Sequence, residues 1–323
     1  MNSVHSFERG IFLFTLDTEL AWGHFDCFDP AMFSAGGKRE RQAIMRLLDM
    51  FDEYQISATW AVVGHLFYAK CEQCEVCPVR DWQGKFESYH HVYEVSSPLW
   101  YAADIMQTLV ERRANHEIAF HGYTHRIFDE QSMSAAEARF EIDEWVRVVQ
   151  RMNVPRPGAV VFPRNKVGHV QEFGERGFLC YRGDELLPAD YYQFPVFGKL
   201  INRLDLLFQF RVPQVYLPQA AAQGLLNLPA SRGLFRVRPA AQRLLNCFGL
   251  GNLPLDRLLM GVEKAAREKK ILHVYAHPYE FRTQKEFDKL RAVLDLVSQK
   301  VRSGSMASAT MTGLAGSFLQ VTR

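Results

Sequence analysis

Histidines and carboxylates are concentrated in four short segments of this chain. The segments span residues 14–19, 121–125, 162–165 and 273–278, and each follows an apolar run that predicts a buried strand. Together they provide two carboxylates, a His-x-x-x-His pair, an arginine and a late histidine. These groups are sufficient to hold a metal ion and to act as general base and general acid. The set therefore indicates a metal-assisted hydrolase.

The second segment carries a histidine pair at metal-binding spacing. His121 and His125 stand four residues apart, so one helical turn or a tight loop lets both imidazoles reach one cation. Such pairs also occur by chance, and this one alone does not define a site. In the first segment, Asp17 and Glu19 stand two apart and project to the same side if the strand continues. Two histidines and one carboxylate leave a coordination position open, as in catalytic metal sites.

Alternating strand and helix patterns indicate how these segments are positioned. Apolar, β-branched and aromatic runs predict strands at 11–16, 57–63, 117–120, 159–162, 178–181 and 271–276. Helical spacing predicts helices at 38–54, 99–113, 134–151, 170–176, 255–269 and 286–302. This alternation favours an α/β fold with a parallel sheet. Because the carboxyl ends of such strands converge, all four segments are expected to share one site.

The four segments resemble the motifs of the polysaccharide deacetylase family, carbohydrate esterase family 4. The first motif of that family usually reads Thr-Phe-Asp-Asp-Gly, whereas residues 15–19 read Thr-Leu-Asp-Thr-Glu. This spacing of the acids is similar to a branch with an Asp-x-Glu motif. The resemblance implies a distorted (β/α) barrel of about seven parallel strands. It also implies that Asp17 is the catalytic base and that Glu19 is a metal ligand.

The remaining motifs extend the resemblance over residues 8–185 and 255–315. The His-(Ser/Thr)-x-x-His motif is matched at 121–125, with a glycine in place of the hydroxyl residue. The arginine of the third motif is present as Arg164, which by resemblance would tether Asp17 and keep it ionised. The last motif ends in a histidine after an apolar strand, which implies that His277 is the general acid. The remaining motif falls near Asp184, which we expect to orient His277.

We predict a single deacetylase-like catalytic domain over residues 1–323 with two insertions. The first, at about 68–98, is polar and irregular. The second, at about 186–254, is rich in Pro, Phe, Tyr and Leu and contains an apolar segment with helical spacing at 197–210. Two interpretations of this second insertion are open. It is either a cap over the barrel mouth or an amphipathic patch that makes weak contact with a membrane surface through 190–215.

The resemblance implies a metal-dependent N-deacetylase. Its substrate would be an N-acetyl or N-formyl amino sugar in an intracellular glycan, lipopolysaccharide or nucleotide-sugar precursor. Zinc is the metal that we expect, although cobalt, nickel or iron suit the same donors. One alternative is a cyclic amide or ureide hydrolase of the same superfamily. Another is a non-catalytic glycan-binding relative, which would be expected to lose the base or the acid, whereas both are present here.

Composition and charge argue against several other classes of protein. The chain has 323 residues, 48% of them apolar, and can bury a large core. Its formal net charge is only +2, so we expect no nucleic-acid partner. The first ten residues lack the apolar core of a signal peptide, and no window offers the roughly 20 apolar residues of a membrane span. Six cysteines without a secretion signal favour reduced thiols and a cytoplasmic location.

Three thiols form a further cluster within the first insertion. Cys71, Cys74 and Cys77 have the spacing of a structural zinc site. Candidates for a fourth ligand are Cys27, His90 and His91. The alternative is three surface cysteines in a loop, because no second Cys-x-x-Cys completes the pattern.

Single aromatic and histidine residues near the four segments allow further predictions. Trp22 and Tyr279 are candidates for a cleft wall that stacks on a sugar ring. His273 stands four residues before His277 on the same predicted strand, about 13 Å away along it, and is expected to be structural. The tail from residue 306 is small and polar with apolar interruptions.

Overall fold

The computed structural model describes most of the chain. It describes residues 7–27, 29, 32–70, 98–112, 115–154, 157–188, 195–220, 224–235, 237 and 239–321. The predicted thiol cluster at 71–77 and most of the first insertion lie outside these residues. None of the helices within the described ranges is long and apolar enough to cross a membrane.

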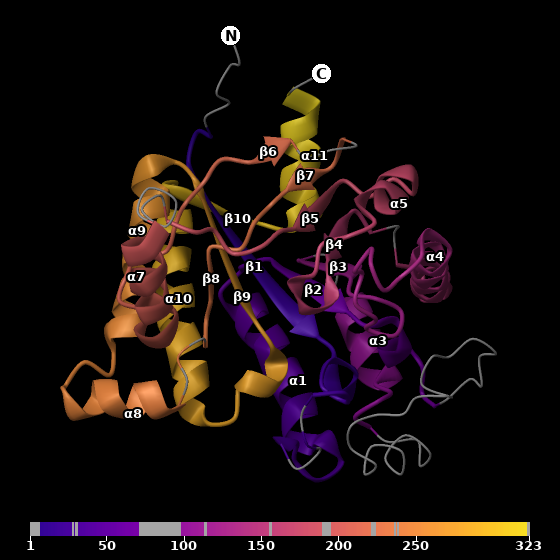
Figure 1. The fold of residues 1–323 in the computed structure, drawn as a ribbon, viewed down its shortest axis with the longest axis horizontal. Helices are drawn as coiled ribbons and strands as arrows, with labels where there is room; N and C mark the ends of the chain where they lie inside the picture. Colours follow the sequence, from indigo (N-terminus) through magenta and orange to yellow (C-terminus); the bar gives the residue numbers. More distant parts are fainter. Residues whose placement is uncertain are drawn as a thin grey trace.

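One ten-stranded sheet forms the centre of the fold (Figure 1). Its strands are β1 (Gly10–Thr18), β2 (Ala58–Val62), β3 (His116–Phe120), β4 (Ala159–Val161), β5 (Cys180–Arg182), β6 (Gln219–Ala220), β7 (Leu226–Asn227), β8 (Arg232–Gly233), β9 (Ile271–Ala276) and β10 (Met306–Ala309). Their order is β6-β7-β5-β4-β3-β2-β1-β9-β8, and β10 also pairs with β1. All pairs of named strands are parallel except β6 with β7. The expected α/β fold is confirmed as a parallel half-barrel.

β1 is the central strand of this sheet. All nine of its residues are buried, because it pairs with β9 along one edge and with β10 and then β2 along the other. Burial on both faces explains why its first seven residues are almost continuously apolar. The polar residues Asp17 and Thr18 come only at its carboxyl end. The strand thus delivers its acids to the edge where the parallel neighbours also end.

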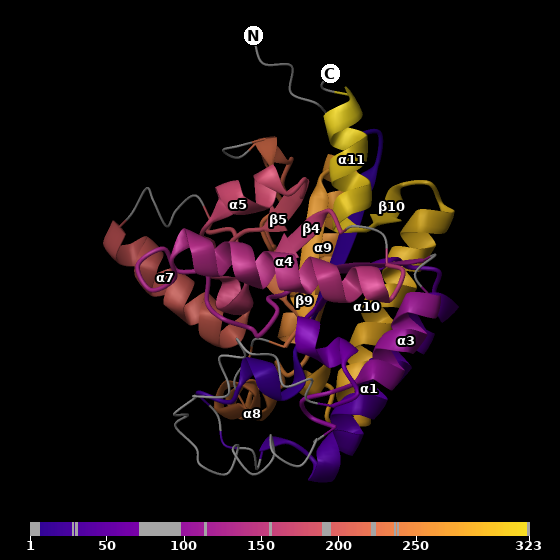
Figure 2. The same cartoon turned by 90° about the vertical axis from the view of Figure 1, so that its right-hand side faces the viewer.

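Nine helices surround the described part of the sheet (Figures 1 and 2). They are α1 (Lys38–Glu53), α3 (Ala103–Glu111), α4 (Ala135–Arg151), α5 (Val170–Glu175), α7 (Pro195–Phe208), α8 (Pro239–Cys247), α9 (Leu253–Glu268), α10 (Gln284–Arg302) and α11 (Met311–Val321). α4 and α10 both begin with a capping box, formed by Ser134 and Glu137 in α4 and by Thr283 and Glu286 in α10. In Figure 1, α9 and α10 lie on the β9 side and α4 and α5 on the β4 side.

The second insertion contributes to both edges of the sheet. β7 pairs with β5 at one edge, and β8 pairs with β9 at the other. The same region supplies α7 and α8. Between residues 186 and 254, the described segments are therefore part of the sheet as well as a covering layer.

Candidate metal centre and active site

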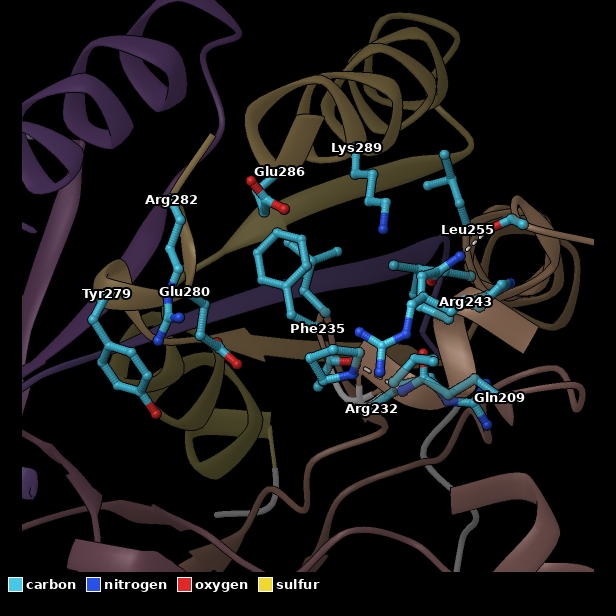
Figure 3. A pocket seen from close by; sticks show the side chains of 18 residues that line it. Gln209, Arg232, Phe235, Arg243, Leu255, Tyr279, Glu280, Arg282, Glu286 and Lys289 are labelled. Carbon is cyan, nitrogen blue, oxygen red and sulfur yellow. Dashed lines mark hydrogen bonds between the residues drawn. The ribbon is translucent and has the colours of Figure 1, made fainter. Parts of the chain in front are cut away.

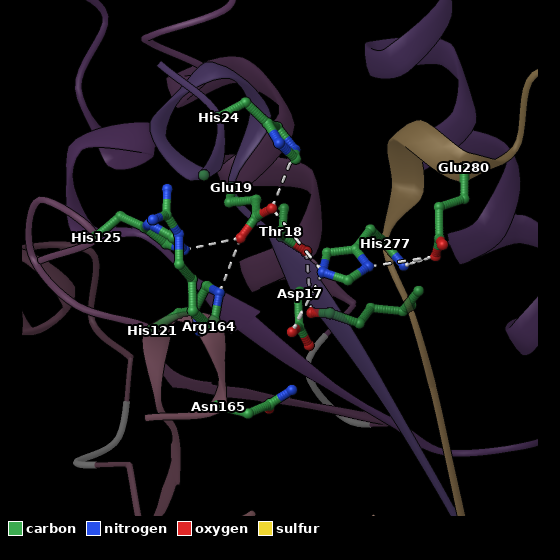
Figure 4. A network of polar contacts seen from close by, with 12 residues as sticks. Asp17, Thr18, Glu19, His24, His121, His125, Arg164, Asn165, His277 and Glu280 are labelled. Carbon is green, nitrogen blue, oxygen red and sulfur yellow. Dashed lines mark hydrogen bonds and ion pairs between the residues drawn. The ribbon is translucent and has the colours of Figure 1, made fainter. Parts of the chain in front are cut away.

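Glu19, His121 and His125 converge at the carboxyl ends of two strands. Glu19 directly follows β1, and both histidines lie in the loop after β3. Oε2 of Glu19 lies 3.1 Å from Nε2 of His121 and 2.9 Å from Nε2 of His125 (Figure 4). All three side chains are buried, and their ligand atoms lie within 4.8 Å of one another. The structure thus brings together the three residues that the sequence indicated as metal ligands.

The donor atoms of this cluster suit a divalent metal ion. Nδ1 of His121 lies 2.8 Å from the carbonyl oxygen of Val161, to which it can donate, so Nε2 turns its lone pair towards Glu19. Nε2 of His125 is buried and makes no hydrogen bond, although it lies 2.9 Å from the carboxylate. Two imidazole nitrogens and one carboxylate oxygen are a ligand set that zinc accepts. The residues present therefore fit the ion that the sequence predicts.

His24 is a further histidine at this cluster, which the sequence did not single out. A short helical turn at Leu20–Gly23 brings it back, so that its Nε2 lies 3.2 Å from Oε1 of Glu19. Burial raises the pKa of Glu19, but His125, His121 and His24 outweigh it and hold that pKa well below its usual range. Glu19 is therefore ionised, which is the form that binds a cation.

Asp17 is held by a buried arginine from β5. Nη1 and Nη2 of Arg182 each donate to one carboxylate oxygen of Asp17, both at 2.6 Å. Arg182 is fully buried and also donates to Oδ1 of Asn165, at 2.7 Å from Nη2, and to the Thr15 hydroxyl. Burial raises the pKa of Asp17, but the charge and hydrogen bonds of Arg182, together with the charge of His277, lower it overall. Asp17 is thus a positioned, ionised carboxylate.

Arg164 does not make the contact with Asp17 that the sequence led us to expect. It forms an ion pair with Asp26, and both side chains are about one-third exposed. Its backbone has a left-handed conformation, with φ at 54°, in the turn Pro163–Asn165. The expectation for Arg164 was therefore wrong: the arginine on Asp17 is Arg182. The only signal for it in the sequence was an arginine directly after the apolar residues of the strand at 178–181.

His277 lies beside both acids at the end of β9. Its Nε2 is 3.6 Å from Oδ2 of Asp17 and 3.9 Å from Oε1 of Glu19. On the other side of the ring, Nδ1 lies 3.3 Å from Oε2 of Glu280, which also accepts the backbone N–H of His277 at 2.7 Å. Burial lowers the pKa of His277, but Glu280, Asp17 and Glu19 raise it to about 9. The imidazole is therefore protonated at neutral pH and can act as an acid.

The orienting partner of His277 is Glu280, which corrects our expectation for Asp184. Asp184 follows β5, is exposed, and lines a cavity with Leu186 and Leu187. No contact joins Asp184 to His277 in the part of the chain that the structure describes. The sequence could have identified Glu280 as this partner, because it stands three residues after His277 in the turn Pro278–Glu280. This is the spacing of a capping box.

His273 is a buried histidine of β9 whose hydrogen-bond partners are not the candidate metal ligands. Its Nδ1 lies 3.1 Å from the carbonyl oxygen of Leu228, and its Nε2 lies 3.2 Å from the Thr15 hydroxyl. Burial and the charge of Arg182 lower its pKa to about 3, so the ring is neutral. These contacts match the structural role that the sequence suggested.

The family model for polysaccharide deacetylase matches residues 27–169. The resemblance to the polysaccharide deacetylase family is confirmed. The matched segment includes His121, His125 and Arg164, while Asp17 and Glu19 lie before it. Among curated proteins, a search found no match to this chain.

Solved structures share the polysaccharide deacetylase fold. A Mycobacterium smegmatis protein assigned as a polysaccharide deacetylase is 14% identical, with a TM-score of 0.55 over 98% of this chain and 92% of that one. A similar assignment from Pseudomonas aeruginosa PAO1 gives 14% identity and 0.55 over 94% and 89%. PuuE allantoinase gives 13% identity and 0.54 over 94% and 88%. Together, the family match and the fold support a deacetylase-type hydrolase.

A buried glutamate from α4 holds the histidine loop of this deacetylase fold. Glu141 accepts the backbone N–H groups of Tyr123 and Thr124 at 2.8 and 3.0 Å, and the Thr124 hydroxyl at 2.5 Å. Gly122, where the family motif usually has a hydroxyl residue, has φ at 81°, and a Cβ there would lie 3.0 Å from the backbone nitrogen of His125. Thr124 and Glu141 thus fix the loop, and no sequence pattern indicated Glu141.

A cavity of about 500 Å³ adjoins the candidate active site (Figure 3). Tyr279 and Glu280 lie at one end of it, and Arg243 from α8 lies at the other. Tyr279 is half-buried, and its ring centroid is 4.9 Å from that of His277, so it can form a cleft wall. Trp22 cannot, because it is fully buried and its Nε1 donates to the carbonyl oxygen of Trp100.

Proposed function

We propose that this chain is a metal-dependent N-deacylase that removes an acetyl or formyl group from an amino sugar. The proposal rests on one observation: a carboxylate and a protonated imidazole flank the cluster of Glu19, His121 and His125. Asp17 is ionised and His277 is charged at neutral pH. A pair of groups with opposite protonation states is what amide hydrolysis requires of a general base and a general acid. We also propose that the first motif belongs to the Asp-x-Glu branch, because Glu19 lies with the two histidines while Asp17 is held by Arg182.

Glu19, His121 and His125 would hold the metal, with zinc as our proposal. When bound, that ion supplies a Lewis acid that polarises an amide carbonyl and lowers the pKa of water. Asp17 takes a proton from the water that attacks the carbonyl carbon. Each of its oxygens accepts one hydrogen bond from Arg182, which leaves a second lone pair free to receive that proton. Arg182 therefore fixes the direction of the base without blocking it.

His277 completes the reaction by protonating the leaving amine. The C–N bond breaks as the imidazolium passes its proton to nitrogen, and the products are a free amine and acetate or formate. Glu280 holds the ring so that Nε2 faces the two acids. Tyr279 next to His277 suits an apolar face of a sugar ring.

For the substrate, we propose an acylated amino sugar in a glycan, lipopolysaccharide or nucleotide-sugar precursor. The mixed charge of the adjoining cavity supports a polar substrate with an anionic portion, because Arg243, Arg282 and Lys289 line it alongside Glu280 and Glu286. The cytoplasm stays our prediction for the location, which cell fractionation would test.

Release of acetate or formate tests the function directly. Purified protein loaded with zinc would be incubated with N-acetylated and N-formylated sugar nucleotides, and the acids would be separated by chromatography. The Asp17→Asn variant is the matched control, since it keeps the size of the side chain and removes the base. We expect turnover in the parent and a loss of about 10²–10⁴-fold in the variant. Equal turnover in the two proteins would exclude this mechanism.

The same assay separates the alternatives. Ring opening of a cyclic ureide without release of either acid would favour the cyclic amide hydrolase. No turnover of any substrate, together with binding of a glycan, would favour a non-catalytic binder. Elemental analysis of the purified protein adds an independent result: one metal per chain supports the catalytic centre alone, and two would also support a site at Cys71, Cys74 and Cys77.

A further inference from the structure

Helix α7 carries an exposed apolar face. Nine of the twelve exposed large apolar side chains among the described residues lie between positions 196 and 250. Six of them are on α7, and Val196 and Phe197 are 78% and 70% exposed. Their spacing is helical, since Val196, Leu200, Leu204 and Leu207 recur every three or four residues along one face. This face is directed to solvent rather than to the core.

The opposite face of α7 fixes the helix to the protein. Asp205 is buried there, and its carboxylate accepts from Nη2 of Arg232 on β8 at 2.8 Å and from the backbone N–H of Arg211 at 2.8 Å. Gly198 is also buried. The orientation of α7 is therefore set by buried polar contacts, and its apolar stripe is displayed by the fold.

Helix α8 contacts α7 and continues the apolar surface. Leu244 and Phe248 stand one helical turn apart, and Phe248 is 71% exposed. Leu250, in the turn that follows, is exposed as well. Ala241 and Leu245 of α8 are buried and hold the helix to the protein. We call the nine exposed side chains of this region the α7–α8 apolar surface: Val196, Phe197, Leu200, Leu204, Leu206, Leu207, Leu244, Phe248 and Leu250.

On α7 and α8 themselves, the exposed charges are all positive. Lys199 and Arg203 on α7 and Arg243 on α8 are exposed. Within 195–208 and 239–250 the only carboxylate is that of Asp205, which is buried and paired. Two carboxylates outside these helices, Asp184 and Glu185, line a cavity with Leu206. An exposed apolar stripe whose own helices carry cations and no exposed carboxylate is typical of helices that lie in the interface of an anionic bilayer.

We propose that the α7–α8 apolar surface docks this protein on an anionic lipid surface. The apolar side chains would enter the acyl boundary, and Lys199, Arg203 and Arg243 would contact lipid phosphates. A second copy of this chain is the competing occupant. It is less favoured because the same cations would face one another across a symmetric interface.

The α7–α8 apolar surface lies beside the cavity that adjoins the candidate active site. Pro239, Gln242 and Arg243 of α8 line the cavity whose other end holds Tyr279 and Glu280 (Figure 3). Docking through α8 would therefore bring the cavity close to the lipid headgroups. If the proposed function holds, the substrate would be an acylated amino sugar carried on a lipid.

Sedimentation with vesicles tests the docking. The zinc-loaded full chain would be mixed with vesicles of phosphatidylcholine alone or with a quarter of phosphatidylglycerol, at low and high salt. We expect binding to the anionic vesicles and weaker binding at high salt. Phe197→Ser with Phe248→Ser, and separately Lys199→Glu with Arg203→Glu, should each reduce the bound fraction about tenfold.

Matched controls lie on other elements. Val167→Ser removes an exposed apolar side chain and Arg151→Glu reverses an exposed charge, and both should bind as the parent does. A parent that stays in the supernatant, or surface variants that bind as well as the controls, would overturn the proposal. So would a dimer, measured by light scattering, that the phenylalanine substitutions dissociate.

Hydrolysis assays keep this proposal separate from the proposed function. The phenylalanine variant should release acid from a water-soluble N-acetylated sugar nucleotide at the parent rate, because it leaves the active site intact. Its turnover of an N-acetylhexosaminyl lipid in vesicles should fall in parallel with its binding. Vesicle binding by a parent that hydrolyses nothing would sustain the docking and reject the function, and the reverse result would reject only the docking.

Discussion

Arg182 binds Asp17 through two parallel hydrogen bonds of 2.6 Å, one to each carboxylate oxygen. The two residues come from β5 and β1, which are separated in the sheet by β4, β3 and β2. Both side chains are buried, so the pair is poorly screened by solvent. The guanidinium therefore controls both the charge and the direction of the base.

Removing this arginine should impair activity and stability together. In Arg182→Met, the Asp17 carboxylate stays buried without its counter-charge, and its pKa should rise. Breaking a buried ion pair from one side typically costs about 3–5 kcal/mol in the free energy of unfolding. We expect such a loss in urea denaturation, with acid release reduced at least about 100-fold at neutral pH.

Two variants make the role of Arg182 specific. Arg164→Met removes the arginine that the family motif indicates, and it should change the unfolding free energy by at most about 1 kcal/mol because its pair with Asp26 is partly exposed. Arg182→Met combined with Asp17→Asn removes both charges, and it should recover stability without recovering turnover. Loss of turnover in Arg164→Met equal to that in Arg182→Met would refute our assignment.

The difference between Arg164 and Arg182 shows what the sequence could and could not predict. Strand ends and motif spacing placed Glu19, His121 and His125 correctly, because each depends on a local pattern at the end of a buried strand. The partner of Asp17 depends instead on the curvature that brings β5 towards β1. It also depends on a left-handed backbone at Arg164, which directs that side chain to Asp26. Neither property has a local signature in the sequence.

The elements of the fold also divide into those with a local sequence pattern and those that depend on tertiary pairing. Long periodic segments such as 38–54 and 271–276 were predicted within a few residues of α1 and β9. β6, β7 and β8 are two residues long, which is too short for any period to appear. The tail at 306–321 forms β10 and α11, although its small residues gave little helical or strand pattern. Pairing with β1 and packing on the core decide these elements.

Glu280 should set the alkaline limit of activity through His277. The charge and hydrogen bond of Glu280 help to raise the pKa of His277 to about 9. Because the imidazole must carry a proton, activity is lost as pH rises through that pKa. Glu280→Gln lowers the pKa, so the alkaline limb of the kcat profile should move to lower pH. Glu286→Gln changes the capping box at the start of α10, nine residues after His277, and should leave the limb in place. An unmoved limb in Glu280→Gln would contradict the role of Glu280.

Glu141 should govern metal affinity from outside the ligand set. Its carboxylate accepts three hydrogen bonds from Tyr123 and Thr124, within the loop that carries both histidines. Glu141→Ala leaves buried N–H groups without acceptors, at about 1–3 kcal/mol for each group. A loosened loop should bind zinc about 10–100-fold more weakly, as measured by competition with a chelating dye.

The control for Glu141 lies on the same helix. Glu144→Ala removes a partly buried glutamate of α4 that pairs with Arg147 and does not contact the histidine loop. It should bind zinc as the parent does. Unchanged zinc affinity in Glu141→Ala would show that Glu141 is not needed to hold the loop. The contact of His65 with the Tyr123 carbonyl oxygen would then be the next one to test.

Metal removal should lower thermal stability through Glu19. Without an ion, its ionised carboxylate is buried among three histidines. A ligand that binds only the folded state adds about 2.7 kcal/mol at a free concentration 100 times its Kd. Zinc added to chelator-treated protein should therefore raise Tm by several degrees. In His121→Ala with His125→Ala, two of the three ligands are missing, and zinc should leave Tm unchanged. A zinc-dependent rise in that variant would place the ion elsewhere, with the thiols at Cys71, Cys74 and Cys77 as the first candidates to examine.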